Sequence, residues 1–276
     1  MVLILLYGYH HGGLGNCVQQ YIACIVENLY YYKQDKVDFR KWKEVSFNRL
    51  LYCKNFFKDI PDFIDFDFPK TNEIIEENIW ALKNKENITK DKLIEIIDKY
   101  FIQYIDLNII NNYNIDFDND LVIHIRSGDI LGNLKLYTQP PYYFYKKIIE
   151  DNNYPNIFII SENKGNPIIN KLLNNFKNIK FISNSSDIDL KILLKSKNLV
   201  TSNSTFSNAA IYTIHNHIYV SKTRMFKIYE KQTNNKIIQY NCDDFYNKIE
   251  NSNFNNNQII NEMLNNELEY IEIITT

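Results

Sequence analysis

A short polar segment after an apolar run carries the strongest chemical signal in the sequence. The run, Leu121–Ile125, is typical of a buried strand, and the polar residues at its end are His124, Arg126, Gly128 and Asp129. An arginine offers five N–H donors in a fixed geometry that matches phosphate oxygens. A glycine lets the backbone turn sharply beside a ligand. The segment therefore favours an anion site centred on Arg126, and an ion pair with Asp129 that only braces a turn is the alternative.

A second candidate is the segment Thr201–Asn208, which is expected between a strand and a helix. Short hydroxyl and amide side chains at a helix start favour an anion, because backbone N–H groups point outward there and the helix dipole is positive. The residues expected to take part are Ser204, Thr205, Ser207 and Asn208. An N-cap in a serine-rich loop is the alternative.

A third candidate is a glycine-rich loop after the apolar run Val2–Tyr7, which reads as a first strand. The loop contains His11, Gly12, Gly13, Gly15 and Asn16. Gly13 and Gly15 match the first two glycines of the dinucleotide fingerprint, but Val18 stands at the third. We therefore expect a tight loop that lines a cleft, with a nicotinamide or flavin site as the alternative.

The elements that would position these residues follow from hydrophobic periodicity. After residue 120 we expect strands at 121–125, 156–160, 179–182, 199–201 and 218–220, with helices at 141–151, 166–176, 187–196 and 206–214. This alternation predicts an α/β fold with a parallel sheet and crossover helices. Ligands bind at the carboxyl ends of such strands, where the first two candidates lie. Upstream, helices are expected at 71–85 and after Thr89, and the predicted domains are 1–115, 116–235 and a helical tail, 236–276, that packs on either domain.

Composition and charge exclude several classes of partner. The net charge of −2 gives no basic footprint for nucleic acid. The opening apolar run is too short to cross a bilayer, so no transmembrane segment is expected. The four cysteines lack metal-ligand spacing and are typical of a reducing compartment, which predicts a cytoplasmic protein.

Two further motifs have plain structural interpretations. Asp187 and Asp189 form a D-x-D pair, which holds a divalent metal in one class of glycosyltransferase, but the same pattern recurs elsewhere in this chain. Carboxylates at a helix start are the expected role, because they suit the helix dipole. His215 and His217 flank a helix-to-strand turn and are expected at the surface.

Taken in order, the three candidate segments resemble the fucosyltransferase superfamily, which includes α-1,2- and α-1,6-fucosyltransferases and protein O-fucosyltransferases. The α-1,2 branch (glycosyltransferase family 11) typically has G-G-L-G-N near the N-terminus, H-x-R-R-G-D after a strand and S-N-S-T-F-S before a late helix. The matching stretches here are Gly12–Asn16, His124–Asp129 and Ser202–Ser207.

The resemblance implies a GT-B-like pair of Rossmann-type domains and an inverting transfer of L-fucose from GDP-fucose to a glycan hydroxyl, without a metal or other cofactor. Residues 1–115 would be the acceptor-side domain and 116–235 the nucleotide-sugar-binding domain. Another nucleotide-sugar donor, or an inactive module that only binds a nucleotide or glycan, is the alternative.

The resemblance also assigns roles to residues. It implies that Arg126 contacts the phosphates, that His124 lies beside the nucleoside, that Glu162 and Asn163 read the guanine, and that Ser204, Thr205, Ser207 and Asn208 lie against the pyrophosphate. Asp129, His10 and His11 are the candidates for the general base. The sequence departs from the family pattern at Ser127, where the second arginine is usual, and at Asn163, where a second acidic residue is usual.

Overall fold

The computed structural model describes residues 5–6, 14–26, 37–38, 64–65, 74–75, 88–213, 215–221, 235–266 and 273–275. The chain divides into two compact units, Met1–Ile109 and Ile110–Thr276. Their boundary lies a few residues before the one that the sequence suggested. Of the predicted glycine loop, His11, Gly12 and Gly13 lie outside the described residues, as does His10.

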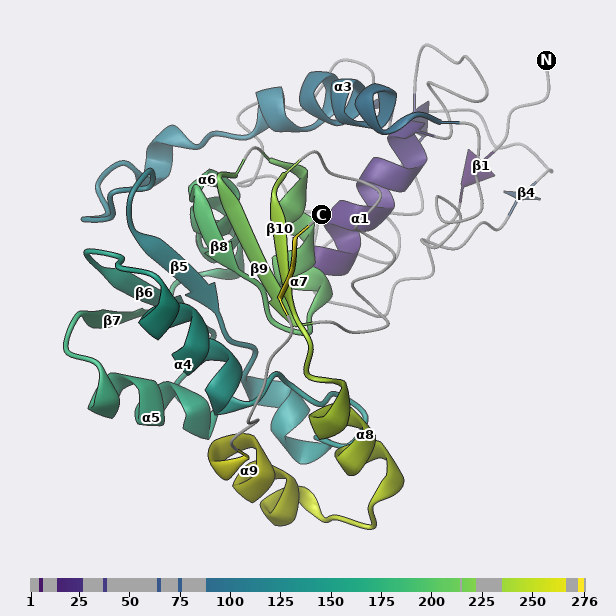
Figure 1. The fold of residues 1–276 in the computed structure, drawn as a ribbon. Coiled ribbons are helices and arrows are strands. Elements are labelled where there is room, and N and C mark those ends of the chain that lie inside the picture. The colour runs from purple at the N-terminus through teal and green to yellow at the C-terminus, as the bar shows by residue number, and fades with distance from the viewer. Residues whose placement is uncertain are drawn as a thin grey trace. The chain divides into compact units, whose positions relative to one another are not determined.

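The described part of the first unit contains two α-helices, four short strands and short 3-10 turns near its end (Figure 1). The helices are α1 (Leu14–Ile25) and α3 (Lys90–Tyr100), and the strand pairs are β1 (Leu5–Leu6) with β4 (Ile74–Ile75) and β2 (Val37–Asp38) with β3 (Ile64–Asp65). Both pairs are parallel. The helix expected over 71–85 is therefore wrong at Ile74–Ile75.

Local sequence explains how α3 begins and where it packs. Thr89 caps it, because its Oγ1 accepts a hydrogen bond from the Lys92 N–H at 3.3 Å. Tyr21 of α1 donates its hydroxyl proton to the Tyr100 carbonyl at 3.0 Å and packs its ring 5.7 Å from that of Phe101. Tyr21 thus joins α1 to the C-terminal end of α3. Gly15 and Asn16 lie in the first turn of α1.

The second unit is built on a seven-stranded sheet. Its strands are β5 (Leu121–His124), β6 (Ile157–Ile160), β7 (Ile179–Ile182), β8 (Asn198–Val200), β9 (His217–Ser221), β10 (Ile237–Tyr240) and β11 (Ile273–Thr275). Their order is β11-β10-β9-β8-β5-β6-β7, and only β11 runs antiparallel to its neighbour. Apart from β11, this is the doubly wound order, which reverses direction between β5 and β8.

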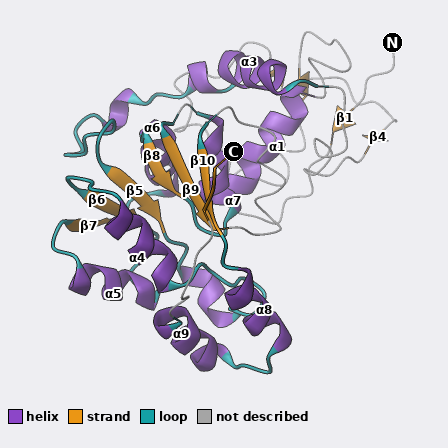
Figure 2. Ribbon diagram, viewed as in Figure 1, coloured by secondary structure: helices purple, strands orange, loops and turns teal. Residues whose placement is uncertain are grey.

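The helices of this unit form two groups (Figure 2). The first group is α4 (Tyr142–Asp151), α5 (Pro167–Asn175), α8 (Asp243–Asn251) and α9 (Asn256–Asn265), whose apolar residues share one buried cluster with alternate residues of the strands. The second group is α6 (Ser186–Lys195), α7 (Thr205–Asn208) and the 3-10 helix η6 (Ala209–Tyr212), which contact one another. Right-handed crossovers on the two sides of the reversal place this second group on the opposite face of the sheet from α4 and α5. Burial of Val122, Leu199 and Ile218, which alternate with the cluster residues, agrees with a sheet covered on both faces.

The predicted α/β class, with a parallel sheet and crossover helices in the C-terminal domain, is confirmed. Two details are corrected. The segment 236–276 is not a purely helical tail, because it also contributes β10 and β11 to the main sheet. The helix expected over 206–214 is split into α7 and η6, since the backbone tightens after Asn208.

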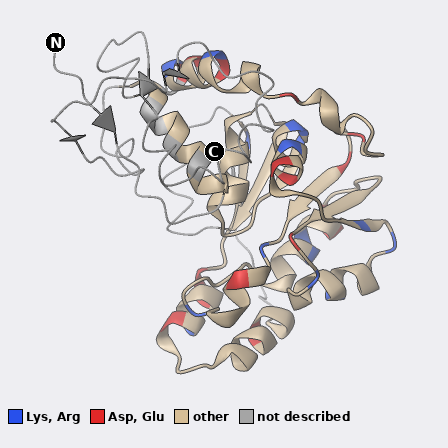
Figure 3. Ribbon diagram, turned by 180° about the vertical axis from the view of Figure 1, so that it is seen from behind, with Lys and Arg blue, Asp and Glu red and all other residues tan. Residues whose placement is uncertain are grey.

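The remaining described elements are short 3-10 turns, η3 (Ile102–Tyr104), η4 (Asn108–Ile110) and η5 (Gly128–Gly132). Figure 3 shows basic and acidic positions interspersed over the described helices and loops. Within the described ranges, no helix has the length and apolar character that crossing a membrane requires.

Candidate functional site

The site lies at the carboxyl ends of β5, β6 and β8, where the loops that follow these strands meet. His124 is paired in register with Ile160 of β6, and β8 is the neighbour of β5 on its other side. The loops after β5 and β8 therefore flank the point where the strand order reverses. Open α/β sheets bind their ligands at such a point.

His124 joins the β5 and β8 loops. Its Nδ1 lies 2.7 Å from the Ser202 hydroxyl, and its ring packs 5.2 Å from that of Phe206. Burial, followed by the nearby charge of Arg126, lowers the pKa of His124 to about 3. The imidazole is therefore neutral at physiological pH and can serve as a hydrogen-bonding spacer rather than as a cation.

This low pKa predicts a dependence of folding stability on pH. Below about pH 6.5 this histidine binds a proton in the unfolded chain but stays neutral in the folded protein. The contribution of His124 to the free energy of unfolding is therefore complete above that pH and is lost as the pH falls toward 3. One such histidine contributes a slope of about 1.4 kcal/mol per pH unit. His124→Asn should reduce the slope by that amount between about pH 4.5 and about pH 5.5. Urea unfolding followed by circular dichroism measures it, and contributions from other groups cancel in the difference. Equal slopes would show that His124 is protonated in the folded state.

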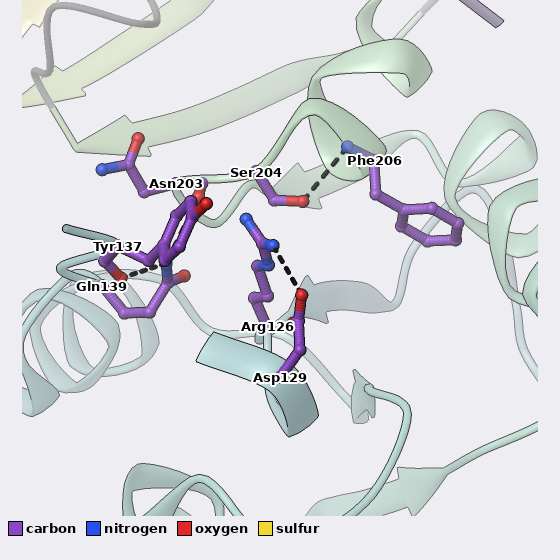
Figure 4. Close-up of polar contacts among 7 residues, drawn as sticks. All are labelled: Arg126, Asp129, Tyr137, Gln139, Asn203, Ser204 and Phe206. Carbon is purple, nitrogen blue, oxygen red and sulfur yellow. Dashed lines mark hydrogen bonds and ion pairs between the residues drawn. The ribbon is translucent and has the colours of Figure 1, made fainter. Parts of the chain in front are cut away.

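Arg126 points from the end of β5 toward the loop that follows β8, between Asp129 and Tyr137 (Figure 4). Its Nη2 lies 3.4 Å from Asp129 Oδ2, which is long for a charge-assisted hydrogen bond. The Asp129 side chain is 77% exposed, so this pair is worth only about 0–1 kcal/mol. The guanidinium also stacks 5.0 Å from the centre of the Tyr137 ring. Arg126 can therefore exchange its present partner for an anionic ligand at little cost.

The turn after Arg126 is shaped by Gly128 and the β6 loop. Gly128 has a φ of 73°, in the left-handed region, and a Cβ there would lie 2.1 Å from Glu162 Oε2. The absence of a side chain at residue 128 thus leaves room for the Glu162 carboxylate. Asn166 caps α5 and also donates from its Nδ2 to the Arg126 carbonyl at 2.9 Å, which ties the two loops together.

Most hydroxyls of the late serine-rich segment, Thr201–Asn208, form hydrogen bonds within the protein. Ser204 caps α7, since its Oγ accepts from the Phe206 N–H at 3.1 Å. The buried Ser207 hydroxyl lies within hydrogen-bonding distance of the Ser202 carbonyl, at 3.2 Å. Thr205 follows the cap as the first residue of α7, and Asn208 is its last residue. Asn208 is buried, and its Oδ1 has no partner among the described residues. The segment is therefore an ordered scaffold beside Arg126.

Sequence reasoning missed the residues that connect this scaffold to the β5 loop. The buried Gln139 donates from Nε2 to the Tyr137 and Asn203 carbonyls at 2.9 and 3.2 Å. Asn203 donates in return from Nδ2 to the Thr138 carbonyl at 3.0 Å. Tyr137 is thereby held where it stacks on Arg126 (Figure 4). Only Asn203 carried a sequence signal, because it lies within the late motif.

The D-x-D pair and the two histidines have structural roles. Asp189 accepts hydrogen bonds from the Asn184 backbone N–H and Nδ2 at 3.2 and 3.0 Å, and burial raises its pKa to about 6. His215 was expected at the surface but is buried, with its ring between the Ser196 and Ala210 carbonyls at 2.5 and 2.7 Å. Its neighbour His217 is less buried. Within the described ranges, no group of three or more His, Cys, Asp or Glu is placed to hold a metal ion.

The structure therefore gathers the residues that the sequence singled out around β5, β6 and β8. Arg126 supplies a cation, Glu162 and Asp129 supply carboxylates, and neutral His124 links two of the loops. Gly15 and Asn16 belong to the other unit. This arrangement suits a ligand that carries an anionic group beside a polar one.

Comparison with solved structures gives distant likenesses. An α-1,6-fucosyltransferase NodZ co-crystallised with GDP is 12% identical, with a TM-score of 0.47 over 86% of this chain and 94% of that chain. A fucosyltransferase NodZ from Bradyrhizobium is 11% identical, with a TM-score of 0.48 over 87% and 94%. NodZ soaked with GDP-fucose is 11% identical, with a TM-score of 0.40 over 87% and 95%. No protein-family model and no curated protein matches the sequence. At these identities and TM-scores, the likenesses assign no activity to this chain.

Proposed function

We propose that this protein is an inverting glycosyltransferase that moves L-fucose from GDP-fucose to a glycan hydroxyl, without a metal or other cofactor. The observation that carries the proposal is the position of Arg126. It lies at the reversal of strand order and points toward the β8 loop, and its ion pair with the exposed Asp129 carboxylate is a long contact. The ordered resemblance of the three motifs to the fucosyltransferase superfamily supports the same conclusion.

In this proposal Arg126 acts on the departing diphosphate. Negative charge grows on that group as the bond to the sugar breaks, so a fixed guanidinium stabilises the transition state more than the bound donor. Asp129 orients the guanidinium before the donor binds. Neutral His124 and Ser202 fix the spacing of the β5 and β8 loops, so that Ser204, Thr205, Ser207 and Asn208 lie on the pyrophosphate side. Glu162 and Asn163, after β6, lie on the nucleoside side.

The acceptor hydroxyl would attack the opposite face of the anomeric carbon, with a base taking its proton. Asp129, His10 and His11 are the candidates. The glycine loop that contains His11 would form part of the acceptor side.

Thermal unfolding with a nucleotide panel tests the proposal. GDP at about a hundred times its dissociation constant should stabilise the protein by roughly 2.7 kcal/mol, whether EDTA or manganese is present. A chain of this size shifts its midpoint by roughly 2–4 °C per kcal/mol. Stabilisation by UDP with manganese would contradict the proposals that GDP-fucose is the donor and that no metal is required. Stabilisation by NAD would favour the nicotinamide alternative. A response to none of them would refute the site.

A binding module without turnover remains the second candidate, and Ser127 favours it. This residue replaces the usual second arginine, and it is 3% exposed, with its hydroxyl hydrogen-bonded to Asn163. A transfer assay with labelled GDP-fucose and a panel of glycan acceptors separates the candidates. Tight GDP binding without transfer or donor hydrolysis would favour the module.

A further inference from the structure

Ser127 and Asn163, the two departures from the family pattern, are hydrogen-bonded to each other. Ser127 Oγ lies 2.7 Å from Asn163 Oδ1, across the loops that follow β5 and β6. Ser127 is buried and Asn163 is exposed. The two uncharged residues that depart from the family pattern therefore contact each other, and we treat the two departures as one change.

Backbone donors fix the direction of every hydrogen bond around the Ser127–Asn163 pair. The Asn166 N–H donates to Ser127 Oγ at 2.9 Å, and the Gly165 N–H donates to Asn163 Oδ1 at 2.8 Å. Because a backbone N–H can only donate, the atom it faces on Asn163 is the oxygen. Ser127 therefore donates its hydroxyl proton to that oxygen, which accepts two hydrogen bonds.

This arrangement leaves the other end of the Asn163 side chain with a defined chemistry. The contacts of the Asn163 side chain with the described residues are all on Oδ1, so its Nδ2 group has no partner among them, and it offers hydrogen-bond donors only. The adjacent Glu162 offers carboxylate oxygens, which accept when ionised, and one of them lies beside Gly128. The β6 loop thus presents an acceptor next to a donor, whereas an acidic pair would present acceptors only.

The strand order places this loop on the nucleoside side of the proposed site. In doubly wound sheets the phosphates lie at the end of the first strand, and an acidic residue that follows the next strand hydrogen-bonds the ribose of the nucleoside. Here β5 is the first strand and β6 the next, so Arg126 occupies the phosphate position and Glu162 the nucleoside position.

On the basis of the proposed function, we propose that Asn163 determines base specificity. Because of this residue, the site does not distinguish guanine from a base that lacks the 2-amino group. Guanine presents two neighbouring N–H donors, N1–H and the 2-amino group, which match a pair of acceptors. Hypoxanthine lacks the amino group, but both bases have N1–H beside the C6 carbonyl oxygen, and this pair matches one acceptor and one donor. The site therefore binds the diphosphates of guanosine and inosine with similar affinity.

Isothermal titration calorimetry with the full chain tests this, with GDP and IDP as probes. The wild-type dissociation constants should agree within about twofold. Asn163→Asp keeps an oxygen for the Ser127 and Gly165 donors and turns the outward group into an acceptor. The variant should prefer GDP by about tenfold or more, the effect expected of one hydrogen bond to a charged group. The matched control is Asn261→Asp on α9, which makes the same chemical change at an exposed asparagine away from the site and should leave the ratio unchanged.

The outcomes separate this inference from the proposed function. If wild type binds GDP more than about tenfold tighter than IDP, or if Asn163→Asp leaves the ratio unchanged, this inference is wrong while the nucleotide site stands. If wild type binds neither diphosphate, the proposed function falls and this inference falls with it. The wild-type comparison decides even if the variant fails to fold.

Discussion

Replacement of Arg126 by alanine is expected to lower the rate of sugar transfer about a hundred- to thousandfold, equivalent to about 3–4 kcal/mol of transition-state stabilisation. In the proposed reaction the guanidinium meets a charge that grows as the sugar leaves. The loss should therefore fall on kcat more than on KM. Initial rates over a range of GDP-fucose concentrations measure both constants, and donor hydrolysis gives a second readout that needs no acceptor.

The fold should tolerate this change. The contact of Arg126 with Asp129 spans 3.4 Å and involves a carboxylate that is 77% exposed, so its loss costs about 0–1 kcal/mol of folding free energy. Thermal unfolding of the variant without a ligand should therefore match wild type closely. A large fall in the unfolding midpoint would mean that the arginine is a structural brace.

Two variants make the result specific. Arg126→Lys keeps the positive charge but loses the fixed pair of donors, so it should recover only part of the activity. Lys146→Ala removes one positive charge from α4, where Lys146 lies 3.8 Å from Glu150 one helical turn away. Full activity is expected there. An active Arg126→Ala variant, or an equal loss in Lys146→Ala, would contradict the assigned role.

The sheet of the second unit was predictable because its strands are short apolar runs separated by helical periodicity. Strands β5 to β9 and helices α4 to α6 lie within a residue or two of their expected positions. Strand β10 was not predicted, because Ile237–Tyr240 follows an asparagine-rich stretch and nothing in the local sequence distinguishes such a short apolar run from a helix start. Its pairing with β9 is a long-range contact that periodicity does not encode.

The candidate site was predictable in its charged residues and less so in its supporting contacts. His124 stands out as a polar residue inside a buried strand, and Arg126 stands out as a cation two residues after the end of that strand. The stacking of Tyr137 on Arg126 depends on a loop path that Gln139 and Asn203 fix through backbone carbonyls, and carbonyls leave no trace in a sequence. His215 was misplaced for the same reason, since backbone carbonyls satisfy its buried ring.

Replacement of Gly128 by alanine is expected to weaken both the fold and the binding of GDP. With a φ of 73°, an alanine would strain the backbone by about 1–2 kcal/mol. Its Cβ would also stand 2.1 Å from Glu162 Oε2, so the carboxylate must leave its present position. Loss of one hydrogen bond between a charged group and the nucleoside costs about 1.5–3 kcal/mol, so the affinity for GDP should fall about tenfold or more.

Gly132 provides the matched control, because it belongs to the same 3-10 helix and a Cβ built there meets no atom within 4 Å. Gly132→Ala should change the unfolding free energy by no more than about 0.5 kcal/mol and leave the affinity unchanged. A double-mutant cycle with Glu162→Ala separates the effect of backbone strain at residue 128 from the effect of displacing the Glu162 carboxylate. If the loss of affinity acts through the carboxylate, Gly128→Ala will add nothing to binding once Glu162 is gone, while the strain in the fold persists. A Gly128→Ala variant that binds GDP as wild type does would show that the position of Glu162 is irrelevant to the nucleotide, and Arg126 alone would then carry the site.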